Sequence, residues 1–527
     1  MTQTSHVSPT RYITTAIPFV NAAPHLGFAL EVIQADTLAR FYRQRGDDVR
    51  FLAGTDENSI KNVRAAEAAG DSVADFVARN AERFQALPES LNLSYDDFIR
   101  TSVDPRHQPG VTKLWQVCCE RGDIYKRSYK GLYCVGCEQF YRPDELIDGR
   151  CPEHDAPLEE IEEENWFFRL SNYEGQLRDL YRKGTIRVVP HARQNEISAL
   201  IERGLEDFSI SRSAERARGW GIPVPGDPGQ VIYVWFDALT NYITALGYGT
   251  DEAELARYWT GTSARDHVIG KGITRFHAVY WPAILLSAGL PLPTRILVHG
   301  YLTTEGRKIS KSLGNAIDPT VYAERFGTDA LRYFLLRHIR TTEDGDISLD
   351  RFEAAYKSEL AGQLGNLVHR TLSMIEHSCG RTLCEPSKGF IEHDPLIRHA
   401  LGLQEIATAH LNAYAFDRAL DAVWKLVAEA NKYVADQQPW AHAKAVAAAQ
   451  TADERQAAVT RLNDSLYSVA WTLQIIATAL APFMPSICAQ LLQKLGLEER
   501  DDGLRPVLAG AKIAAGAPLF PVLPADP

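Results

Sequence analysis

The sequence is poor in three features that would assign it to a class at once: a cysteine framework, a membrane span and an excess of positive charge. Only eight of its 527 residues are cysteines, and five of these are scattered, which excludes the disulfide framework of a small secreted protein. The formal net charge of -11 argues against a polybasic protein. A local basic groove for a phosphate backbone is still compatible with that balance.

Targeting and membrane signals are also missing from the pattern. The first ten residues are polar and contain no apolar signal-peptide core, so we expect a cytoplasmic protein. The one uncharged apolar stretch, residues 469–492, contains Gln474, Pro482 and Pro485. We therefore predict a buried bundle helix there and no membrane partner.

A strand, loop, helix, strand pattern opens the chain. Residues 12–17 and 49–53 are typical of buried strands, and between them apolar side chains recur at helical spacing from Leu30 to Phe41. This order predicts a parallel, right-handed unit whose ligand crevice lies at the carboxyl ends of its strands. His25 and Asp56 are expected to face that crevice.

The rest of the pattern predicts an insertion and a helical C-terminal part. Residues 129–164 are rich in turns, cysteines and acidic side chains, which indicates an insertion. Strand-like runs return at residues 231–236, 267–270 and 295–299, and after Asp350 long helical patterns take over. We predict an α/β domain with a parallel sheet, followed by an all-α bundle.

Three cysteines and a histidine form two close pairs, Cys134-x2-Cys137 and Cys151-x2-His154. Two such knuckles bring four soft or borderline ligands within tetrahedral reach, as in structural zinc sites. Reduced thiols without a metal would not explain the paired spacing. We predict one structural Zn²⁺, because four protein ligands leave no open position for water.

Two short motifs suit a nucleoside triphosphate. His25 directly precedes the predicted helix, where free backbone N–H groups and an imidazole can meet a phosphate oxygen. Lys308, Ser310, Lys311 and Ser312 lie in a loop flanked by glycines, which suits a pyrophosphate leaving group. Each motif alone has a more ordinary interpretation, as a surface histidine and as a solvated basic loop.

Together the two motifs resemble the signature sequences of class I aminoacyl-tRNA synthetases, His-Ile-Gly-His and Lys-Met-Ser-Lys-Ser, in the right order. The resemblance extends over nearly the whole chain to the methionyl-tRNA synthetase family, for example through Gly54-Thr55-Asp56-Glu57. It implies a Rossmann-type catalytic domain with a zinc-bearing insertion and an anticodon-binding bundle. The implied reaction is activation of L-methionine with ATP and Mg²⁺, followed by transfer to tRNA(Met).

The resemblance also implies roles for single residues. Asp56 would hold the substrate ammonium, and a soft thioether side chain gains from aromatic walls. The residues implied to enclose it are Ile17, Phe19, Trp235, Ala238, Tyr242, Phe276, His277 and Trp281. Those implied for ATP are His25, Gly27, Phe28, Gly270, Lys311 and Ser312, with His25, Lys308 and Lys311 as the catalytic groups.

One trio in the helical part suits RNA. Asn366 and Arg370 are four residues apart and share a helix face, and Trp440 follows Pro439. An amide, a guanidinium and an indole can read and stack unpaired bases, although such trios are usually ordinary surface. The resemblance implies that these three residues contact the CAU anticodon.

Several positions depart from the family pattern. Phe28 stands where the second signature histidine belongs, and Asn58 and Ser59 replace a His-Gly pair. Gly272 replaces an aspartate near the ribose, and Phe19 a common tyrosine. We hypothesise an altered nucleotide pocket, with slower turnover or reduced sensitivity to inhibitors that mimic the adenylate.

Five segments are predicted: residues 1–115 and 209–300 as the two halves of the catalytic domain, 116–208 as the insertion, 301–355 with the lysine motif, and 356–527 as the helical domain. No appended dimerisation domain follows, so we expect a monomer.

Two other functions stay open. A weakened paralogue that binds tRNA or regulates is suggested by Phe28 and Gly272. A synthetase for another aliphatic amino acid is disfavoured, because about 280 residues between His25 and Lys308 are too few for a large editing insertion.

Overall fold

The computed structural model describes residues 8–152, 155–262, 264–304, 306–309, 317–497, 508–521 and 523, with the backbone only at 139, 144, 307 and 308. The chain forms two compact units. The first comprises Met1–Glu89, Leu93–Tyr301 and Ile309–Pro319, and the second comprises Ser90–Asn92, Leu302–Lys308 and Thr320–Pro527.

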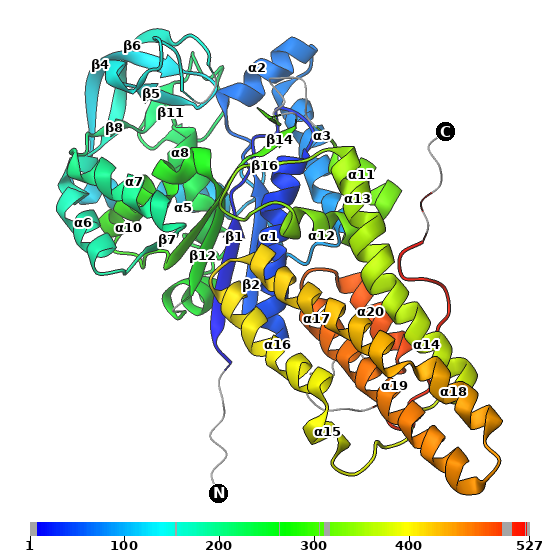
Figure 1. Cartoon of the computed structure of the whole chain (residues 1–527). Coiled ribbons are helices and arrows are strands. Elements are labelled where there is room, and N and C mark those ends of the chain that lie inside the picture. The colour runs from blue at the N-terminus through cyan, green and yellow to red at the C-terminus, as the bar shows by residue number, and fades with distance from the viewer. Residues whose placement is uncertain are drawn as a thin grey trace, which may run out of the picture. The chain divides into compact units, whose positions relative to one another are not determined.

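A six-stranded parallel sheet forms the centre of the first unit (Figure 1), with the strand order β3-β2-β1-β12-β13-β7. Its strands are β1 (Thr10–Thr15), β2 (Asp48–Thr55), β3 (Asp97–Arg100), β7 (Arg187–Val189), β12 (Arg265–Gly270) and β13 (Arg295–His299). Their apolar, β-branched side chains are buried on both faces, as expected where helices cover a parallel sheet. The prediction of a parallel α/β domain is confirmed.

Helices cover this sheet. The first, α1 (Leu26–Gln44), packs on β1, β2 and β12 and is buried over most of its circumference. The others are α2 (Ile60–Ala69), α3 (Val73–Gln85), α4 (Leu87–Leu91), α5 (His107–Glu120), α6 (Glu174–Arg182), α7 (His191–Glu202), α8 (Val234–Thr244), α9 (Ala253–Leu255) and α10 (Trp281–Ala288). Two π-helical turns, η3 (Ala256–Thr260) and η5 (Phe276–Tyr280), precede β12 and α10.

The predicted strand at residues 231–236 is wrong in its second half. Strand β11 (Asp227–Ile232) ends at Ile232, and Tyr233 caps α8 with extended backbone angles. Val, Ile, Tyr, Trp and Phe favour strands, which suggested a longer one. Tertiary burial overrides that preference, because every residue of α8 is buried. Trp235 therefore lies in the first turn of a helix.

Two small sheets, formed by strands between α5 and α8, are separate from the central sheet, and three of their strands follow residue 208, the predicted end of the insertion. Four antiparallel strands have the order β5-β4-β6-β8, and three more have the order β10-β11-β9. Their bounds are β4 (Ile124–Cys134), β5 (Gln139–Tyr141), β6 (Glu159–Phe168), β8 (Phe208–Ser209), β9 (Ser211–Ser213) and β10 (Pro223–Val224). Strands β6 and β9 lie side by side and connect the two sheets.

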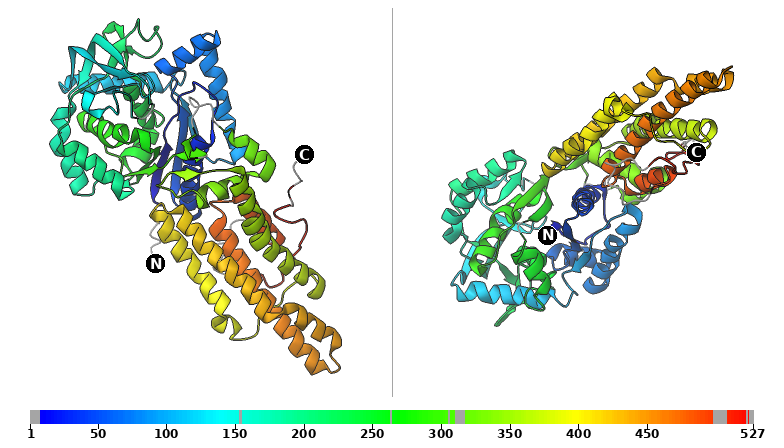
Figure 2. Two further views of the ribbon diagram at one scale, coloured as in Figure 1. Left: turned by 45° about the horizontal axis from the view of Figure 1, so that its top comes forward. Right: turned by 90° about the horizontal axis from the view of Figure 1, so that it is seen from below.

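The second unit is mainly helical, as predicted (Figures 1 and 2). A small sheet of β14 (Leu302–Thr304), β15 (Arg307–Lys308) and β16 (Gly345–Asp346) precedes the bundle. The helices are α11 (Pro319–Phe326), α12 (Thr328–Arg337), α13 (Leu349–Ala355), η7 (Tyr356–Gly365), α14 (Asn366–Ser378), α15 (Phe390–His393), α16 (Pro395–Asn412), α17 (Phe416–Gln437), α18 (Pro439–Ala448), α19 (Ala452–Leu480) and α20 (Pro485–Lys494).

The uncharged stretch at residues 469–492 divides between two helices. Helix α19 ends at Leu480, and α20 starts at Pro485, where a proline at the first helical position is favourable. The last three turns of α19 are buried inside the bundle, which confirms the prediction of a bundle segment, but the single predicted helix is wrong because residues 481–484 separate α19 from α20. Over the ranges described above, the helices include none long and apolar enough to cross a bilayer.

Candidate active site

The side chains predicted to surround a thioether lie together in the first unit. The rings of Trp235 and Phe276 stack, with centroids 3.8 Å apart and planes at 6°. Phe19 meets Trp235 edge-on at 6.4 Å. Tyr242 Oη and His277 Nε2 are hydrogen-bonded at 2.7 Å. These residues, called the aromatic slot below, form one stacked aromatic wall with Phe19 at its edge and a polar pair nearby, surroundings that suit a flexible, polarisable side chain.

Three further predicted residues back this slot. Trp281 is fully buried, with its ring centroid 6.1 Å from that of Tyr242. Ala238 follows Trp235 on α8 and is also buried. A side chain at Gly54 would clash with Ile17 Cγ2, which places Ile17 against the end of β2. All three are packing residues of the slot.

Asp56 follows β2 and is 2% exposed. Its backbone N–H donates to Pro18 at 2.9 Å, and a bridge pairs it with Phe19, so the carboxyl lies at the aromatic slot. Within the described part of the chain, its Oδ1 has no hydrogen-bond partner. Burial, then the nearby carboxyls of Asp237 and Glu138, raise its pKa well above the ordinary value. A buried acceptor in this state is strongly stabilised by a ligand cation.

Two histidines beneath the slot are held neutral. Burial lowers the pKa of His277 to about 4 and the pKa of His267 well below its ordinary value. His277 contacts the carbonyl of Ile273 through Nδ1 and the hydroxyl of Tyr242 through Nε2. The hydroxyl of Thr14 lies 2.7 Å from His267 Nδ1. These two histidines therefore add no charge beside Asp56 at neutral pH.

His25 is the N-cap of α1. Its Nδ1 accepts the backbone N–H of Gly27 at 3.0 Å, as a capping side chain does. Because Nδ1 accepts, the ring proton of the neutral imidazole lies on Nε2. A Cβ at position 27 would lie 2.8 Å from His25 Cε1, so only glycine leaves room for this ring. The motif thus presents one N–H donor at a helix N-terminus, where anions bind.

Phe28 packs into the protein. It is 9% exposed, and its ring meets Phe84 of α3 edge-to-face at 5.2 Å. The position predicted to meet ATP therefore anchors α1 on α3 through an aromatic pair.

Another departure from the family pattern, Asn58, is also engaged. Its amide donates to Asp237 at 2.8 Å, and Asp237 in turn contacts His107 Nε2 at 2.5 Å. The amide thus completes a buried polar chain beside Asp56.

The structure reveals one pair that the sequence did not indicate. His299, the last residue of β13, contacts Glu31 of α1 through Nε2 at 2.9 Å. A side chain at Gly270 would lie 3.6 Å from the His299 ring and 3.9 Å from Glu31 Oε2. The predicted nucleotide residue Gly270 therefore adjoins this pair at the carboxyl ends of β12 and β13, where ligands of parallel sheets bind. In the sequence, a glutamate among the apolar residues of the predicted helix, Glu31, could have indicated a buried polar partner.

The three cysteines of the predicted metal site converge. The ligand atoms of Cys134, Cys137 and Cys151 all lie within 4.8 Å of one another, and two of these residues are buried. Tyr141 Oη is 3.1 Å from Cys137 Sγ. Three thiols at such distances fit a soft or borderline metal ion such as Zn²⁺. The fourth predicted ligand, His154, lies outside the described residues.

The lysine motif is described only in part. Lys308 belongs to the two-residue strand β15, which pairs with Thr303 of β14, and Ile309 is buried. Lys311 and Ser312 lie outside the described residues.

The second unit brings together two members of the predicted anticodon trio. The guanidinium carbon of Arg370 lies 5.8 Å from the centroid of the Trp440 ring. Asn366 and Arg370 are exposed at the first two turns of α14, and Trp440 is 38% exposed in the first turn of α18. A large exposed indole beside a guanidinium is suited to stacking on an unpaired base.

Comparisons with known proteins agree with this architecture. The model of the tRNA synthetases class I (M) family matches residues 11–161 and 155–372. The methionine--tRNA ligase of Brucella suis biovar 1 is 42% identical over 520 residues, which are 97% of each chain. That of Thermotoga maritima is 40% identical over 524 residues, which are 97% of this chain and 80% of the relative.

A solved structure gives the same result. Mycobacterium tuberculosis methionyl-tRNA synthetase in complex with methionyl-adenylate superposes with a TM-score of 0.91 at 40% identity, covering 98% of this chain and all of the other. The parallel-sheet unit, the helical unit that follows it in sequence and the matching family model identify a class I aminoacyl-tRNA synthetase. The chain belongs to the family of methionine--tRNA ligases.

Proposed function

We propose that this chain is a cytoplasmic ligase that charges tRNA(Met) with L-methionine. The observation that carries the proposal is the buried Asp56 carboxyl, which lies at the end of an aromatic slot and has one oxygen without a partner in the described part of the chain. The carboxyl suits an amino-acid ammonium and the slot suits a thioether. A related structure that holds methionyl-adenylate supports this assignment.

The first step forms the adenylate. A carboxylate oxygen of methionine attacks the α-phosphorus of ATP, and the bond to pyrophosphate breaks. The Nε2–H of His25 at the N-terminus of α1 would donate to a phosphate oxygen. Lys308, Lys311 and Ser312 would hold the leaving pyrophosphate, and Mg²⁺ would accompany the nucleotide. The rate enhancement comes from positioning and electrostatics.

The second step transfers methionine. A hydroxyl of the 3'-terminal ribose attacks the activated carbonyl, and AMP leaves. Asn366, Arg370 and Trp440 would select the tRNA through its anticodon, since the guanidinium and the indole already lie together. The chain would act as a monomer.

Zn²⁺ would be bound by Cys134, Cys137 and Cys151, with His154 as the fourth ligand. Four protein ligands would leave no site for a water molecule, so the ion would stabilise the insertion and take no part in the reaction.

Methionine-dependent exchange of labelled pyrophosphate into ATP, followed by charging of tRNA(Met), tests the proposal. We expect both activities. Absence of exchange with methionine would refute the proposal, and tRNA binding without exchange would favour the weakened paralogue. Exchange with valine, isoleucine or leucine in place of methionine would favour the other aliphatic specificity.

Phe28 and Gly272 suggest a nucleotide pocket that differs from the family pattern. We expect slower turnover, or weaker inhibition by a methionyl-adenylate mimic, than for a relative with the full histidine motif. The substitution Phe28→His, which restores the motif, should bring turnover and inhibition to the values of that relative. Equal inhibition of the two chains would contradict the altered pocket.

A further inference from the structure

Glu138, the residue after the second thiol of the knuckle, is held in an unusual state. It is 2% exposed, and its φ of 56° lies in the left-handed region that non-glycine residues rarely adopt. Backbone of this kind persists where the surrounding contacts fix it, and it gathers at functional sites. The contacts of Glu138 lead to both walls of the aromatic slot.

The carboxyl of Glu138 binds the start of helix α2. Its Oε1 accepts the backbone N–H of Lys61 at 3.0 Å, next to Ser59, whose own side chain caps α2 by accepting the N–H of Asn62. The first N–H groups of a helix have no partner within the helix, and the helix dipole favours an acidic group there. Tyr133 Oη lies 3.4 Å from the other oxygen.

The backbone of the same dipeptide binds the other wall. The carbonyl of Cys137 accepts the indole N–H of Trp235 at 3.3 Å. The carbonyl of Glu138 accepts the hydroxyl of Tyr233. These two bonds fix the turn in which α8 begins, and with it the ring that stacks on Phe276.

Lys61 carries the contact to Phe19. Its ammonium lies 5.0 Å from the centroid of the Phe19 ring, a cation–π distance. The carboxyl of Glu138 thus binds the backbone of Lys61, whose side chain contacts Phe19. The carbonyl of Glu138 binds Tyr233, the N-cap of the helix that carries Trp235.

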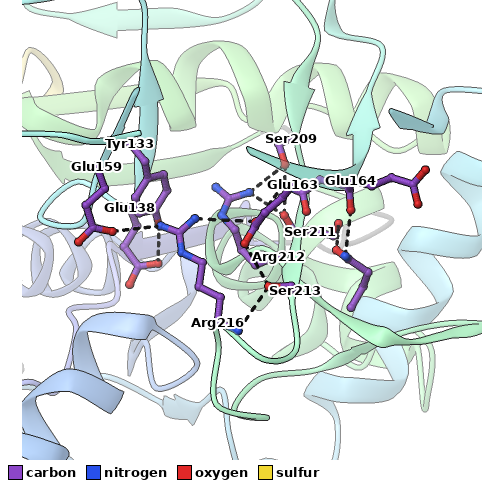
Figure 3. A network of polar contacts seen from close by, with 12 residues as sticks. Tyr133, Glu138, Glu159, Glu163, Glu164, Ser209, Ser211, Arg212, Ser213 and Arg216 are labelled. Carbon is purple, nitrogen blue, oxygen red and sulfur yellow. Dashed lines mark hydrogen bonds and ion pairs between the residues drawn. The ribbon is translucent and has the colours of Figure 1, made fainter. Parts of the chain in front are cut away.

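Two arginines complete the surroundings of Glu138 (Figure 3). The guanidinium carbon of Arg216 lies 4.1 Å over the ring of Tyr133. The guanidinium carbon of Arg212 lies 4.1 Å over the ring of Tyr233. Arg216 also forms an ion pair with Glu159 at 3.7 Å. The carboxyl of Glu138 is therefore enclosed by donors, aromatic faces and positive charge.

We propose that Glu138 is a positioning residue for methionine binding: it fastens the knuckle to the start of α2 and thereby sets the separation of Phe19 and Trp235. This inference rests on the proposed function. Glu138 lies behind the slot and would not touch the substrate.

The test compares Glu138→Ala and Glu138→Gln with the parent chain, by equilibrium binding of methionine and of ATP separately and by thermal unfolding. We expect Glu138→Ala to raise the methionine Kd about tenfold, because the Lys61 N–H loses its buried acceptor. The amide oxygen of Gln can still accept that N–H, so the expected rise is about two- to threefold. The ATP Kd should stay within about twofold in both variants.

Glu162, exposed on β6 of the same insertion, provides matched controls in Glu162→Ala and Glu162→Gln, which should leave both Kd values unchanged. Unchanged methionine binding in the Glu138 variants would overturn the positioning role. Equal losses of methionine and ATP binding would also overturn it, since they would indicate a merely structural residue. If Glu138→Ala does not fold, the graded effect of Glu138→Gln decides. A parent chain that binds no methionine would overturn the proposed function itself.

Discussion

The amino-acid slot and the anticodon trio differ in burial. Asp56 and His277 are at most 2% exposed, whereas Trp440 is 38% exposed. The slot is a buried cluster in which one carboxyl and one polar pair are surrounded by aromatic side chains. The trio is an open surface of long side chains with a single ring contact.

On the proposed function, the difference in burial reflects the two ligands. A small zwitterion offers few atoms, so each contact has to be strengthened by excluding water. An RNA loop offers stacked bases and a charged backbone, so an exposed aromatic and a guanidinium are sufficient. Mutations in the slot should therefore have large effects on one substrate, and mutations in the trio should have smaller effects on another.

The largest expected effect comes from Asp56→Asn. The substrate ammonium would lose its proposed carboxylate partner, at a cost of about 3–5 kcal/mol, so pyrophosphate exchange should fall by roughly a hundredfold to several thousandfold. Asp436→Asn, at an exposed position of α17, is the control. If exchange stayed within about tenfold of the parent value, methionine binding would not depend on the Asp56 carboxyl, and the contrast between the two sites would be wrong.

The slot should also respond to pH. His277 has a pKa of about 4 in the folded protein, against 6.5 for an ordinary histidine, because burial disfavours its charged form. The unfolded chain binds the proton first, so this group's contribution to stability is complete above about pH 6.5 and is lost as the pH falls toward 4.

Denaturant titrations between pH 4.5 and 7.5 measure this contribution. The difference in unfolding free energy between the parent and His277→Gln should grow with pH across that window, by up to about 3 kcal/mol. His442→Gln, at a half-buried position of α18, should give a difference that varies far less. If the difference in unfolding free energy between the parent and His277→Gln did not change with pH, His277 would not be a neutral imidazole in the folded protein.

Trp440→Ala should act on the RNA alone. Loss of base stacking is worth roughly 1–3 kcal/mol, so kcat/KM for tRNA should fall about 10- to 100-fold. Pyrophosphate exchange without tRNA should remain at the parent level, which serves as the internal control. A parallel loss of exchange would show that the two sites do not separate as the comparison requires.

Arg370→Lys should give the smallest change. The positive charge remains, but the planar group that lies over the Trp440 ring is lost. An exposed cation–π contact is worth about 0.5–1 kcal/mol, so kcat/KM for tRNA should fall only about two- to fivefold. Trp440→Ala measured in the same background should remove that difference. An undiminished effect of Arg370→Lys without the indole would mean that Arg370 acts independently.

Strands β1, β2, β12 and β13 of the parallel sheet could be predicted because each is a short apolar run that ends near a glycine or a polar residue, as at Gly54 and Gly270. Strands β3 and β7 have only four and three residues and begin with charged side chains, so no apolar run marked them. The start of α8 could not, since Tyr233 and Trp235 favour a strand locally and only burial makes that segment a helix. The convergence of Cys134, Cys137 and Cys151 followed from local spacing, which constrains the chain directly.

Contacts between distant residues were beyond reach. His299 and Glu31 are 268 positions apart, and Asn58 and Asp237 are 179 apart, so neither pair leaves a local pattern. Glu138 follows a cysteine pair in an acid-rich insertion, where nothing in the neighbouring sequence marks it as buried. Its left-handed backbone is a property of the folded surroundings and not of glutamate.

The vacant acceptor on Asp56 also opposes the folding of the empty protein. A carboxyl that lies among Asp237, Glu138 and Glu57 in a dry slot destabilises the native state until a cation arrives. Methionine binding should therefore raise the melting temperature, while Asp56→Asn should raise it without any ligand. Asp56 is therefore the residue that matters most for binding methionine, and yet its charge lowers the stability of the protein without ligand.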